Sequence, residues 1–396
     1  MFEHVEAYPG DPILSLNEDF QKDPRPDKVN LSIGIYFDET GKLPMMRAVR
    51  EAEQQVGKEA GARPYIPMSG LANYREEIRK LVLSEAVVPE RIASLQTIGA
   101  SGALKVGSDF LKRYFPASSV WISDPSWENH RVVFEGSGFI VNSYPYYDPA
   151  TGGLHFEEML AALRGLPARS VVLLHACCHN PTGVDLTPEQ WQALIPLFLE
   201  RDLIAFIDMA YQGFGDDIES DAYAPRAFAA AGVSTLIANS FSKNFSLYGE
   251  RCGGLTVVCR DSEERDRVQG QLMSTVRANY SNPPTHGAKV IAKVLGDPKL
   301  RSAWQEELGA MRDRIKSMRR AIHGNLQRCG VSTDLSRYLA QRGMFTYTGL
   351  TAQQVDRLRQ AHGVYLLRSG RMCVAGLNDS NVVPVANAIA HVMTHH

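Results

Sequence analysis

The fold of this chain is decided by residues 170–208, which read SVVLLHACCHNPTGVDLTPEQWQALIPLFLERDLIAFID. The outer segments, Ser170–His175 and Leu203–Asp208, are apolar runs without polar alternation, which is typical of strands buried on both faces of a parallel sheet. Between them, Pro188–Glu200 has the pattern of a helix, with Thr187 as its expected N-cap and a proline at its first position. This alternation predicts an α/β fold.

The same rhythm continues on both sides of this stretch. Further apolar runs lie at Val120–Ser123, Phe139–Val141, Thr235–Asn239 and Gly254–Val258. Turn-forming residues and helical patterns separate several of these runs, which is the order expected of a sheet covered by helices. We therefore predict a large α/β domain over residues 45–300.

The C-terminal part has a different pattern. Ser302–Leu326 is typical of one long amphipathic helix, and short strands are expected at Met344–Tyr347 and Met372–Ala375. We predict a smaller α+β domain over residues 301–396, with residues 1–44 forming an N-terminal arm and part of that domain.

The composition excludes several classes of partner. The formal net charge of the 396 residues is −2, which gives no electrostatic reason to expect nucleic acid or an anionic membrane. No apolar stretch approaches the roughly 20 residues of a spanning helix, and Met1–Glu6 lacks the features of a signal peptide. Six irregularly placed cysteines suit a reducing compartment. A cytoplasmic protein that acts on small molecules is expected.

The most informative polar segment is Asn239-Ser240-Phe241-Ser242-Lys243-Asn244, which follows a predicted strand. A lysine becomes a Schiff-base nucleophile when burial or a neighbouring cation makes its ammonium easy to deprotonate. Ser240, Ser242 and Arg251 are suited to holding a dianion beside Lys243, as a phosphorylated aldehyde would require. The alternative is a surface lysine in a polar loop.

Two other strand ends carry polar groups. Asp208 ends one apolar run, and a buried carboxylate there would keep a pyridine nitrogen protonated and make the ring an electron sink. Tyr211 follows three residues later, and Asn180 lies in the turn His179–Gly183, where its amide would reach a phenolate oxygen. The alternatives are a helix cap for Asp208 and a simple turn around Asn180.

Further candidates are suited to a phosphate, a flat ring and carboxylates. Gly99–Gly102 precedes a helical pattern, and small residues at a helix N-terminus let backbone N–H groups approach a phosphate. Trp127 is suited to stacking on a ring, although tryptophan is more often part of a core. Arg277 and Arg371 are suited to bidentate contacts with carboxylates, although surface salt bridges are the usual fate of arginine.

In their order and spacing, these motifs together resemble the class I aminotransferases of fold type I, which use pyridoxal 5′-phosphate. Within that family the chain is most similar to the aspartate/aromatic group, and to its bacterial aromatic-amino-acid members. The resemblance covers essentially the whole chain, through Asn30–Tyr36, Tyr65–Leu71, Cys177–Gly183, Ser240–Phe245 and Arg371–Gly376. It implies a large domain with a mostly parallel sheet, covered by helices, and a smaller α+β domain.

The resemblance also implies roles for single residues. Lys243 would hold the cofactor as a Schiff base and act as the acid and base, and Asp208 would pair with the pyridine nitrogen. Tyr211 and Asn180 would hold the ring oxygen, and Trp127 would stack on the ring. Five residues would surround the phosphate: Ala100, Ser101, Ser240, Ser242 and Arg251.

Substrate contacts follow from the same resemblance. Arg371 would bind the α-carboxylate near Gly34, and Arg277 would meet a distal carboxylate. The family is a homodimer with shared active sites, so Tyr65 and Arg277 would come from the neighbouring subunit. An uncharged aromatic side chain would leave Arg277 unpaired unless it turns to solvent. We therefore expect Arg277 to be mobile.

The expected function is the transfer of an amino group between aromatic or dicarboxylic L-amino acids and 2-oxoglutarate, by a ping-pong mechanism. The amino-acid sequences of Asp124–His130 and Gly363–Leu366 are similar to those of aromatic-amino-acid members. The alternatives are an aspartate-preferring aminotransferase, another fold-type I enzyme such as a decarboxylase or β-lyase, and a regulator without catalysis. A nicotinamide dehydrogenase is disfavoured, because no G-x-G-x-x-G follows a strand.

Overall fold

A computed structural model describes residues 1–8, 10–59 and 61–394 of the chain. It consists of two compact units, one formed by residues 44–313 and the other by residues 1–43 together with 314–396. The helix α11 (Pro298–Arg328) contains the second division between them, at residues 313 and 314. The boundary expected at residue 300 therefore lies near the start of this helix, and each unit is described by itself.

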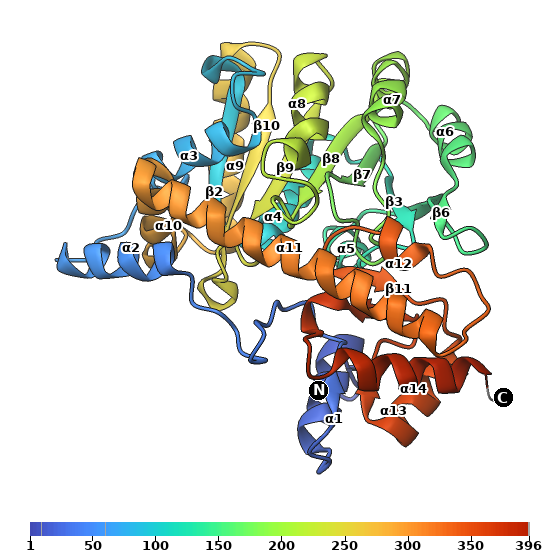
Figure 1. The fold of residues 1–396 in the computed structure, drawn as a ribbon. Coiled ribbons are helices and arrows are strands. Elements are labelled where there is room, and N and C mark those ends of the chain that lie inside the picture. The colour runs from blue at the N-terminus through green and yellow to red at the C-terminus, as the bar shows by residue number, and fades with distance from the viewer. Residues whose placement is uncertain (9, 60, 395–396) are drawn as a thin grey trace. The chain divides into compact units, whose positions relative to one another are not determined.

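The larger unit is built on a seven-stranded sheet (Figure 1). In order across the sheet, its strands are β2 (Ile92–Ile98), β10 (Cys252–Val258), β9 (Thr235–Ser240), β8 (Ile204–Met209), β7 (Val171–His175), β3 (Val120–Asp124) and β4 (Val141–Pro145). Neighbours are parallel except at β10, which is antiparallel to both β9 and β2. Every residue of β7 to β10 is buried, as the unbroken apolar runs predicted.

Two strands differ from the sequence-based prediction. The run expected at Phe139–Val141 contributes only its last residue to β4, because the Phe139 N–H closes the end of a helix by donating to the Phe134 carbonyl at 3.1 Å. The edge strand β2 was not predicted. Its polar residues Ser94 and Gln96 interrupt the apolar pattern, and they are satisfied by side chains and backbone distant in sequence, such as Gln269.

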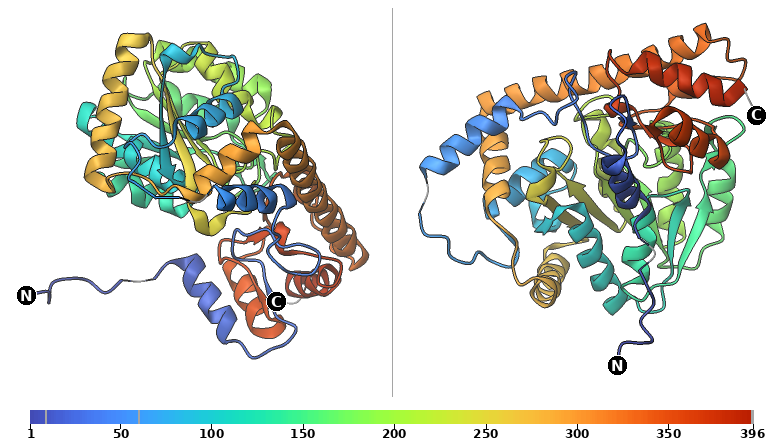
Figure 2. Two further views of the ribbon diagram at one scale, coloured as in Figure 1. Left: turned by 90° about the vertical axis from the view of Figure 1, so that its left-hand side faces the viewer. Right: turned by 90° about the horizontal axis from the view of Figure 1, so that it is seen from below.

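Helices cover both faces of the sheet (Figure 2). One core cluster joins the sheet to α4 (Gly99–Tyr114), α5 (Glu128–Glu135) and α9 (Ser262–Asn279). The remaining helices of this unit are α2 (Arg47–Lys58), α3 (Ala72–Val82), α6 (Phe156–Arg164), α7 (Pro188–Glu200), α8 (Tyr223–Ala230) and α10 (His286–Gly296). Helix α7 has the predicted bounds and begins with a capping box between Thr187 and Gln190.

Short elements complete the larger unit. They are the strands β5 (Tyr147–Asp148) and β6 (Gly153–Leu154), with the 3₁₀ turns η1 (Pro89–Arg91), η2 (Ser220–Ala222) and η3 (Tyr248–Glu250). Since a mostly parallel sheet carries helices on both faces, the predicted α/β fold class is confirmed.

The smaller unit contains two pairs of short strands. Strand β1 (Val29–Asn30) is parallel to β12 (Val364–Tyr365), and β11 (Phe345–Tyr347) is antiparallel to β13 (Arg371–Cys373). Around them lie η4 (Val374–Gly376), α1 (Pro12–Lys22), α12 (Arg337–Ala340), α13 (Ala352–His362) and α14 (Val382–Thr394). The strands β11 and β13 lie where two short strands were expected, and β1 brings the N-terminal segment into this unit.

Within the described residues, none of the helices combines the length and the apolar character needed to cross a bilayer. All six cysteines are free thiols, and only Cys329 is exposed.

Candidate active site

The parallel strands of the larger unit bring several predicted residues to one edge of the sheet. His175 on β7 is in register with Asp208 on β8, and Asp208 is in register with Ala238 on β9. Lys243 follows the end of β9 by three residues. Because β10 is antiparallel, its first residue follows Arg251 at this same edge. The candidate site therefore lies beyond the carboxyl ends of the parallel strands, where ligands bind in open α/β sheets.

Lys243 is half-buried, and its Nζ lies 4.9 Å from the centre of the Tyr211 ring. Burial lowers the pKa of Lys243 to about 8, the charge of Asp208 opposes this shift, and Arg251 adds to it. An ammonium with this pKa is partly deprotonated near neutral pH, so its amine is available as a nucleophile.

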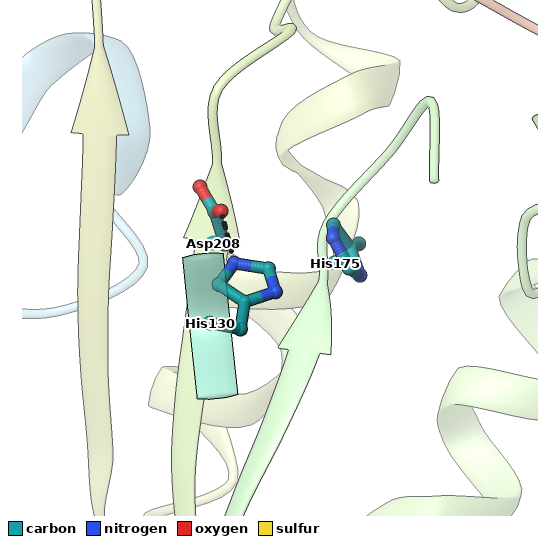
Figure 3. A group of neighbouring side chains, drawn as sticks. All are labelled: His130, His175 and Asp208. Carbon is teal, nitrogen blue, oxygen red and sulfur yellow. Dashed lines mark hydrogen bonds and ion pairs between the residues drawn. The ribbon is translucent and has the colours of Figure 1, made fainter. Parts of the chain in front are cut away.

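Asp208 is 5% exposed, and its two oxygens have different surroundings. His130 donates from Nε2 to Oδ2 at 2.9 Å (Figure 3), whereas Oδ1 has no hydrogen-bond partner among the described residues. Burial by itself would raise the pKa of Asp208, but the hydrogen bond from His130, together with the charge of Lys243, lowers it. A buried, ionised carboxylate with one unused oxygen fits a protonated ring nitrogen.

His130 is itself held in place. Its ring is fully buried, and its Nδ1 lies 2.9 Å from the Ser126 hydroxyl. With the Nε2 proton donated to Asp208, Nδ1 accepts the hydroxyl proton of Ser126. The Trp127 ring stands edge-on to the His130 ring, at 5.1 Å between centroids. Trp127 is half-buried and packs against the core cluster, so both the core role and the predicted ring contact are compatible with its place.

An anion cradle is formed where α4 begins. Gly99 opens this helix with φ +64°, and a Cβ there would lie 2.8 Å from Nη2 of Arg251. Arg251 donates to the Ser242 hydroxyl at 3.2 Å, and the Ser242 N–H donates to the Ser240 hydroxyl at 3.2 Å. A guanidinium, two hydroxyls and a helix N-terminus together fit a phosphate. Ala100 and Ser101 belong to the first turn of that helix, which begins at Gly99 and not after Gly102 as expected.

Asn180 is buried in the turn that follows β7. The carboxylate of Asp185 holds this turn, accepting from the N–H groups of Cys178 and His179 at 2.7 and 2.8 Å. Tyr211 is buried in the loop that follows β8. Both therefore lie just after neighbouring parallel strands, at the edge that holds Asp208.

Tyr65 and Arg277 are different, because both are exposed. Tyr65 is 93% exposed. Arg277, in the last turn of α9, is exposed and donates to the hydroxyl of Ser281. Their predicted roles require a second subunit and remain predictions.

The two predicted residues of the smaller unit meet at one aromatic ring. Arg371 is 1% exposed, donates from Nη2 to the Ser32 carbonyl at 2.7 Å, and lies 4.4 Å above the centre of the Phe345 ring. A Cβ on Gly34 would lie 2.8 Å from Cζ of the same ring. Glycine is therefore needed for the close approach, and the buried guanidinium fits a carboxylate ligand.

Sequence reasoning missed the histidines behind Asp208. Figure 3 shows His130 and His175 beside this carboxylate, and the ring centroids of His175 and His179 are 4.2 Å apart. Burial lowers the pKa of His175 to about 3 and lowers the pKa of His179 well below its usual value, so both rings are neutral. The sequence offered a signal for two of them, because His175 ends an apolar run and His179 lies in the turn that follows it. The position of His130 depends on how α5 packs.

The chain is similar to known proteins over nearly its whole length. A family model described as aminotransferase class I and II matches residues 26–389. The tyrosine aminotransferase of Klebsiella pneumoniae is 57% identical over 397 residues, which cover 99% of this chain and 100% of the relative. The solved structure of an aromatic-amino-acid aminotransferase from Burkholderia pseudomallei, covalently bound to pyridoxal phosphate, has a TM-score of 0.97 at 50% identity, covering 100% of both chains.

A second solved structure has the same level of similarity. It is a psychrophilic aromatic amino acids aminotransferase from Psychrobacter sp. B6, cocrystallised with aspartic acid. Its TM-score is 0.97 at 50% identity, again over 100% of both chains.

Proposed function

Since the chain belongs to the aminotransferase class I and II family, we propose that it moves amino groups between aromatic or dicarboxylic L-amino acids and 2-oxo acids. The family, the transaminase class and the pyridoxal phosphate cofactor agree with the sequence-based prediction. The observation that carries the proposal is that two groups lie at the same edge of the sheet: Lys243, whose pKa is lowered to about 8, and a buried Asp208 that has one unused oxygen.

When bound, pyridoxal phosphate supplies an electron sink for the carbanion formed at Cα of the amino acid. The chain supplies the rest. The amine of Lys243 would take the proton from Cα of the amino acid and return it at the carbon on the other side of the amino nitrogen, acting as base and then as acid. Asp208 holds a proton at the ring nitrogen, and its partner His130 keeps the carboxylate ionised. The hydroxyl of Tyr211 and the amide of Asn180 donate to the ring oxygen.

The phosphate is proposed to lie in the cradle of Ala100, Ser101, Ser240, Ser242 and Arg251. The guanidinium of Arg251 contributes charge, and the first turn of α4 contributes N–H groups. Trp127 is proposed to cover one face of the ring. The ping-pong order, with 2-oxoglutarate as acceptor, follows if one site must bind both amino acids in turn.

The proposed substrate range rests on two arginines. Arg371 binds the α-carboxylate beside Gly34, and its burial makes it suited to a contact that all substrates share. Arg277 is exposed, so it can meet a dicarboxylate and turn to solvent when the substrate is aromatic. The names of a tyrosine aminotransferase relative, and of an aromatic aminotransferase cocrystallised with aspartic acid, support this dual range.

A homodimer is proposed because two residues assigned to the site, Tyr65 and Arg277, are exposed. Each would complete the site of the partner subunit. Cytoplasmic location is also proposed, and the six free thiols support it.

A spectral half-reaction tests the function. The purified holoenzyme is mixed in turn with phenylalanine, tyrosine, aspartate and glutamate, without a 2-oxo acid, and the loss of the resting cofactor absorbance is followed. Conversion with both aromatic and dicarboxylic amino acids is expected, and it should be absent in Lys243→Ala. A strong preference for aspartate would favour the aspartate-specific alternative, and release of CO₂ would favour a decarboxylase. No conversion with any of the four would refute the aminotransferase proposal.

A further inference from the structure

A second buried carboxylate, Asp221, lies outside the proposed cofactor contacts. It lies 13 residues after Asp208, in η2, and its side chain is 5% exposed. Its Oδ2 accepts from the N–H groups of Gly213 and Gly215 at 2.8 and 2.9 Å, and its Oδ1 accepts from the Asp216 N–H at 3.0 Å. One side chain therefore holds the backbone of the loop that follows β8 at three points.

The backbone of this loop fits closely around the Asp221 carboxylate. Gly213 has φ +94°, a conformation that favours glycine. A Cβ on Gly215 would lie 2.4 Å from Oδ1 of Asp221, so the carboxylate fills the space that a side chain would need. This close fit means that residue 215 must be a glycine for the carboxylate to reach the loop.

The same loop carries Tyr211. The Phe214 N–H donates to the Tyr211 carbonyl at 3.0 Å, which closes a turn between Tyr211 and the two anchored glycines. The Tyr211 ring lies 4.9 Å from Nζ of Lys243. Asp221 and the proposed catalytic residue Lys243 are thus connected through one short turn.

The loop also reaches the residue next to the lysine. The amide of Asn244 donates from Nδ2 to the Gln212 carbonyl at 3.2 Å. Gln212 is in turn fixed, since its Nε2 donates to the carbonyls of Leu81 and Ile218 at 3.1 and 2.9 Å. Two neighbouring loop residues, Tyr211 and Gln212, therefore face the segment of Lys243 and Asn244.

Ionised Asp221 lowers the stability of the folded protein, which argues that its carboxylate has a functional role. Burial raises the pKa of Asp221 to about 6, against the lowering effect of its three N–H bonds. A raised pKa means that the ionised form stabilises the folded state less, so stability contributed by this group falls as pH rises through 6. A neutral hydrogen-bonding residue would avoid that cost but could not accept from all three N–H groups.

We propose that Asp221 is a positioning residue, whose carboxylate fixes the 211–216 loop and thereby places the Tyr211 hydroxyl against the ring oxygen of the cofactor. This inference rests on the proposed function, since it takes the role of Tyr211 from it. It adds a residue that touches neither the cofactor nor the substrate.

The test is a double-mutant cycle on holoenzyme, with the variants Asp221→Asn, Tyr211→Phe and their combination. The readout is the pH midpoint of the cofactor absorbance, which follows protonation of the Schiff-base nitrogen and shifts when a hydrogen bond to the nearby ring oxygen is lost. Tyr211→Phe is expected to shift the midpoint by about one pH unit, through the lost hydrogen bond. Asp221→Asn is expected to shift it in the same direction, and to add nothing further in the Tyr211→Phe background.

Two further measurements separate positioning from loss of structure. The dissociation constant of pyridoxal phosphate from each apoenzyme gives a readout besides activity, and circular dichroism during heating shows whether each variant is folded. Asp217→Asn is the matched control. This neighbouring carboxylate is exposed, and it accepts a hydrogen bond from the Ser220 N–H and not from the loop glycines. Its midpoint and affinity are expected to equal those of the unmodified protein. Asp221→Ala, which leaves three N–H groups without an acceptor, should give a larger shift than Asp221→Asn.

Three outcomes would overturn the proposal that Asp221 positions Tyr211. If Asp221→Asn shifts the midpoint equally with and without the Tyr211 hydroxyl, or does not shift it at all while Tyr211→Phe does, the inference is wrong and the proposed function stands. If Tyr211→Phe itself has no effect, the proposed role of Tyr211 is wrong, and the inference falls with it. If Asp217→Asn matches Asp221→Asn, the effect is a general one of charge, and the inference is again wrong.

Discussion

His130 donates a hydrogen bond from Nε2 to Oδ2 of Asp208 at 2.9 Å, and both side chains are at least 95% buried. This contact leaves Oδ1 as the only carboxylate oxygen of Asp208 without a partner among the described residues. The histidine therefore determines both the orientation of the carboxylate and its state of ionisation, because its hydrogen bond lowers the pKa of Asp208 against the effect of burial.

Replacing His130 should weaken catalysis without removing it. His130→Ala takes away one hydrogen bond to a charged group, which is worth about 1.5–3 kcal/mol, or about 10- to 100-fold in kcat/KM. The pKa of Asp208 should rise, so the remaining activity should fall as pH decreases. Ser126→Ala, which removes only the outer hydroxyl at 2.9 Å, should have a smaller effect. A pH profile of kcat/KM that is identical in His130→Ala and the unmodified enzyme would contradict this account.

The reactivity of Lys243 gives a prediction for the apoenzyme. With a pKa of about 8, roughly a tenth of the Lys243 amine is unprotonated at pH 7, compared with about one part in three thousand at the ordinary pKa. The rate at which pyridoxal phosphate reacts with the apoenzyme should therefore rise with pH and level off above about 8. Stopped-flow absorbance measures this rate.

Two variants give the sign of the charge effects on Lys243. Asp208 raises the pKa of Lys243, so Asp208→Asn should move the midpoint of the rate profile below that of the unmodified protein. Arg251 lowers this pKa, so Arg251→Met should move the midpoint up. No shift in either variant would mean that burial alone governs the pKa of Lys243, and shifts in the opposite directions would contradict this account.

Much of this arrangement was predictable from local patterns. The bounds of α7 followed from Thr187 and the proline after it, since a cap and a first-turn proline act within a few residues. The buried strands β7 and β8 followed from their unbroken apolar runs. Asp208 and Lys243 were candidates because each lies at or just beyond the end of a strand, and the resemblance to the aminotransferases gave them their expected roles.

The features that the sequence did not predict are those that depend on packing between segments distant in sequence. His130 meets Asp208 across 78 residues of sequence, and no local spacing connects a residue of α5 with the end of β8. The role of Asp221 was hidden for another reason. An acidic residue before a helix is usually read as a cap, but its carboxylate turns back to the loop that precedes it. The strand β2 was missed because its polar residues are satisfied only by distant partners.

Gly34 should be sensitive to the smallest substitution. In Gly34→Ala the new Cβ would lie 2.8 Å from Cζ of Phe345, so the ring must move away from its place beneath Arg371. We expect KM to rise about tenfold for every amino acid, while the affinity for pyridoxal phosphate is unchanged, since the contact with the shared α-carboxylate is disturbed. Steady-state kinetics and cofactor titration check this. Gly324→Ala is the control, because nothing lies within 4 Å of its added Cβ. A rise in KM for dicarboxylates alone would contradict the assignment of Arg371.

Arg277 should separate the two substrate classes. It is exposed, and it donates a hydrogen bond to the hydroxyl of Ser281, which costs little to break. Arg277→Ala should lower kcat/KM for aspartate by about 100-fold, through loss of a bidentate contact with the distal carboxylate. The value for phenylalanine should change by less than about threefold, because an aromatic side chain gains nothing from the guanidinium. Arg267→Ala, another exposed arginine of α9, should leave both values unchanged. Equal losses for aspartate and phenylalanine would mean that Arg277 holds the site together and does not select between substrates.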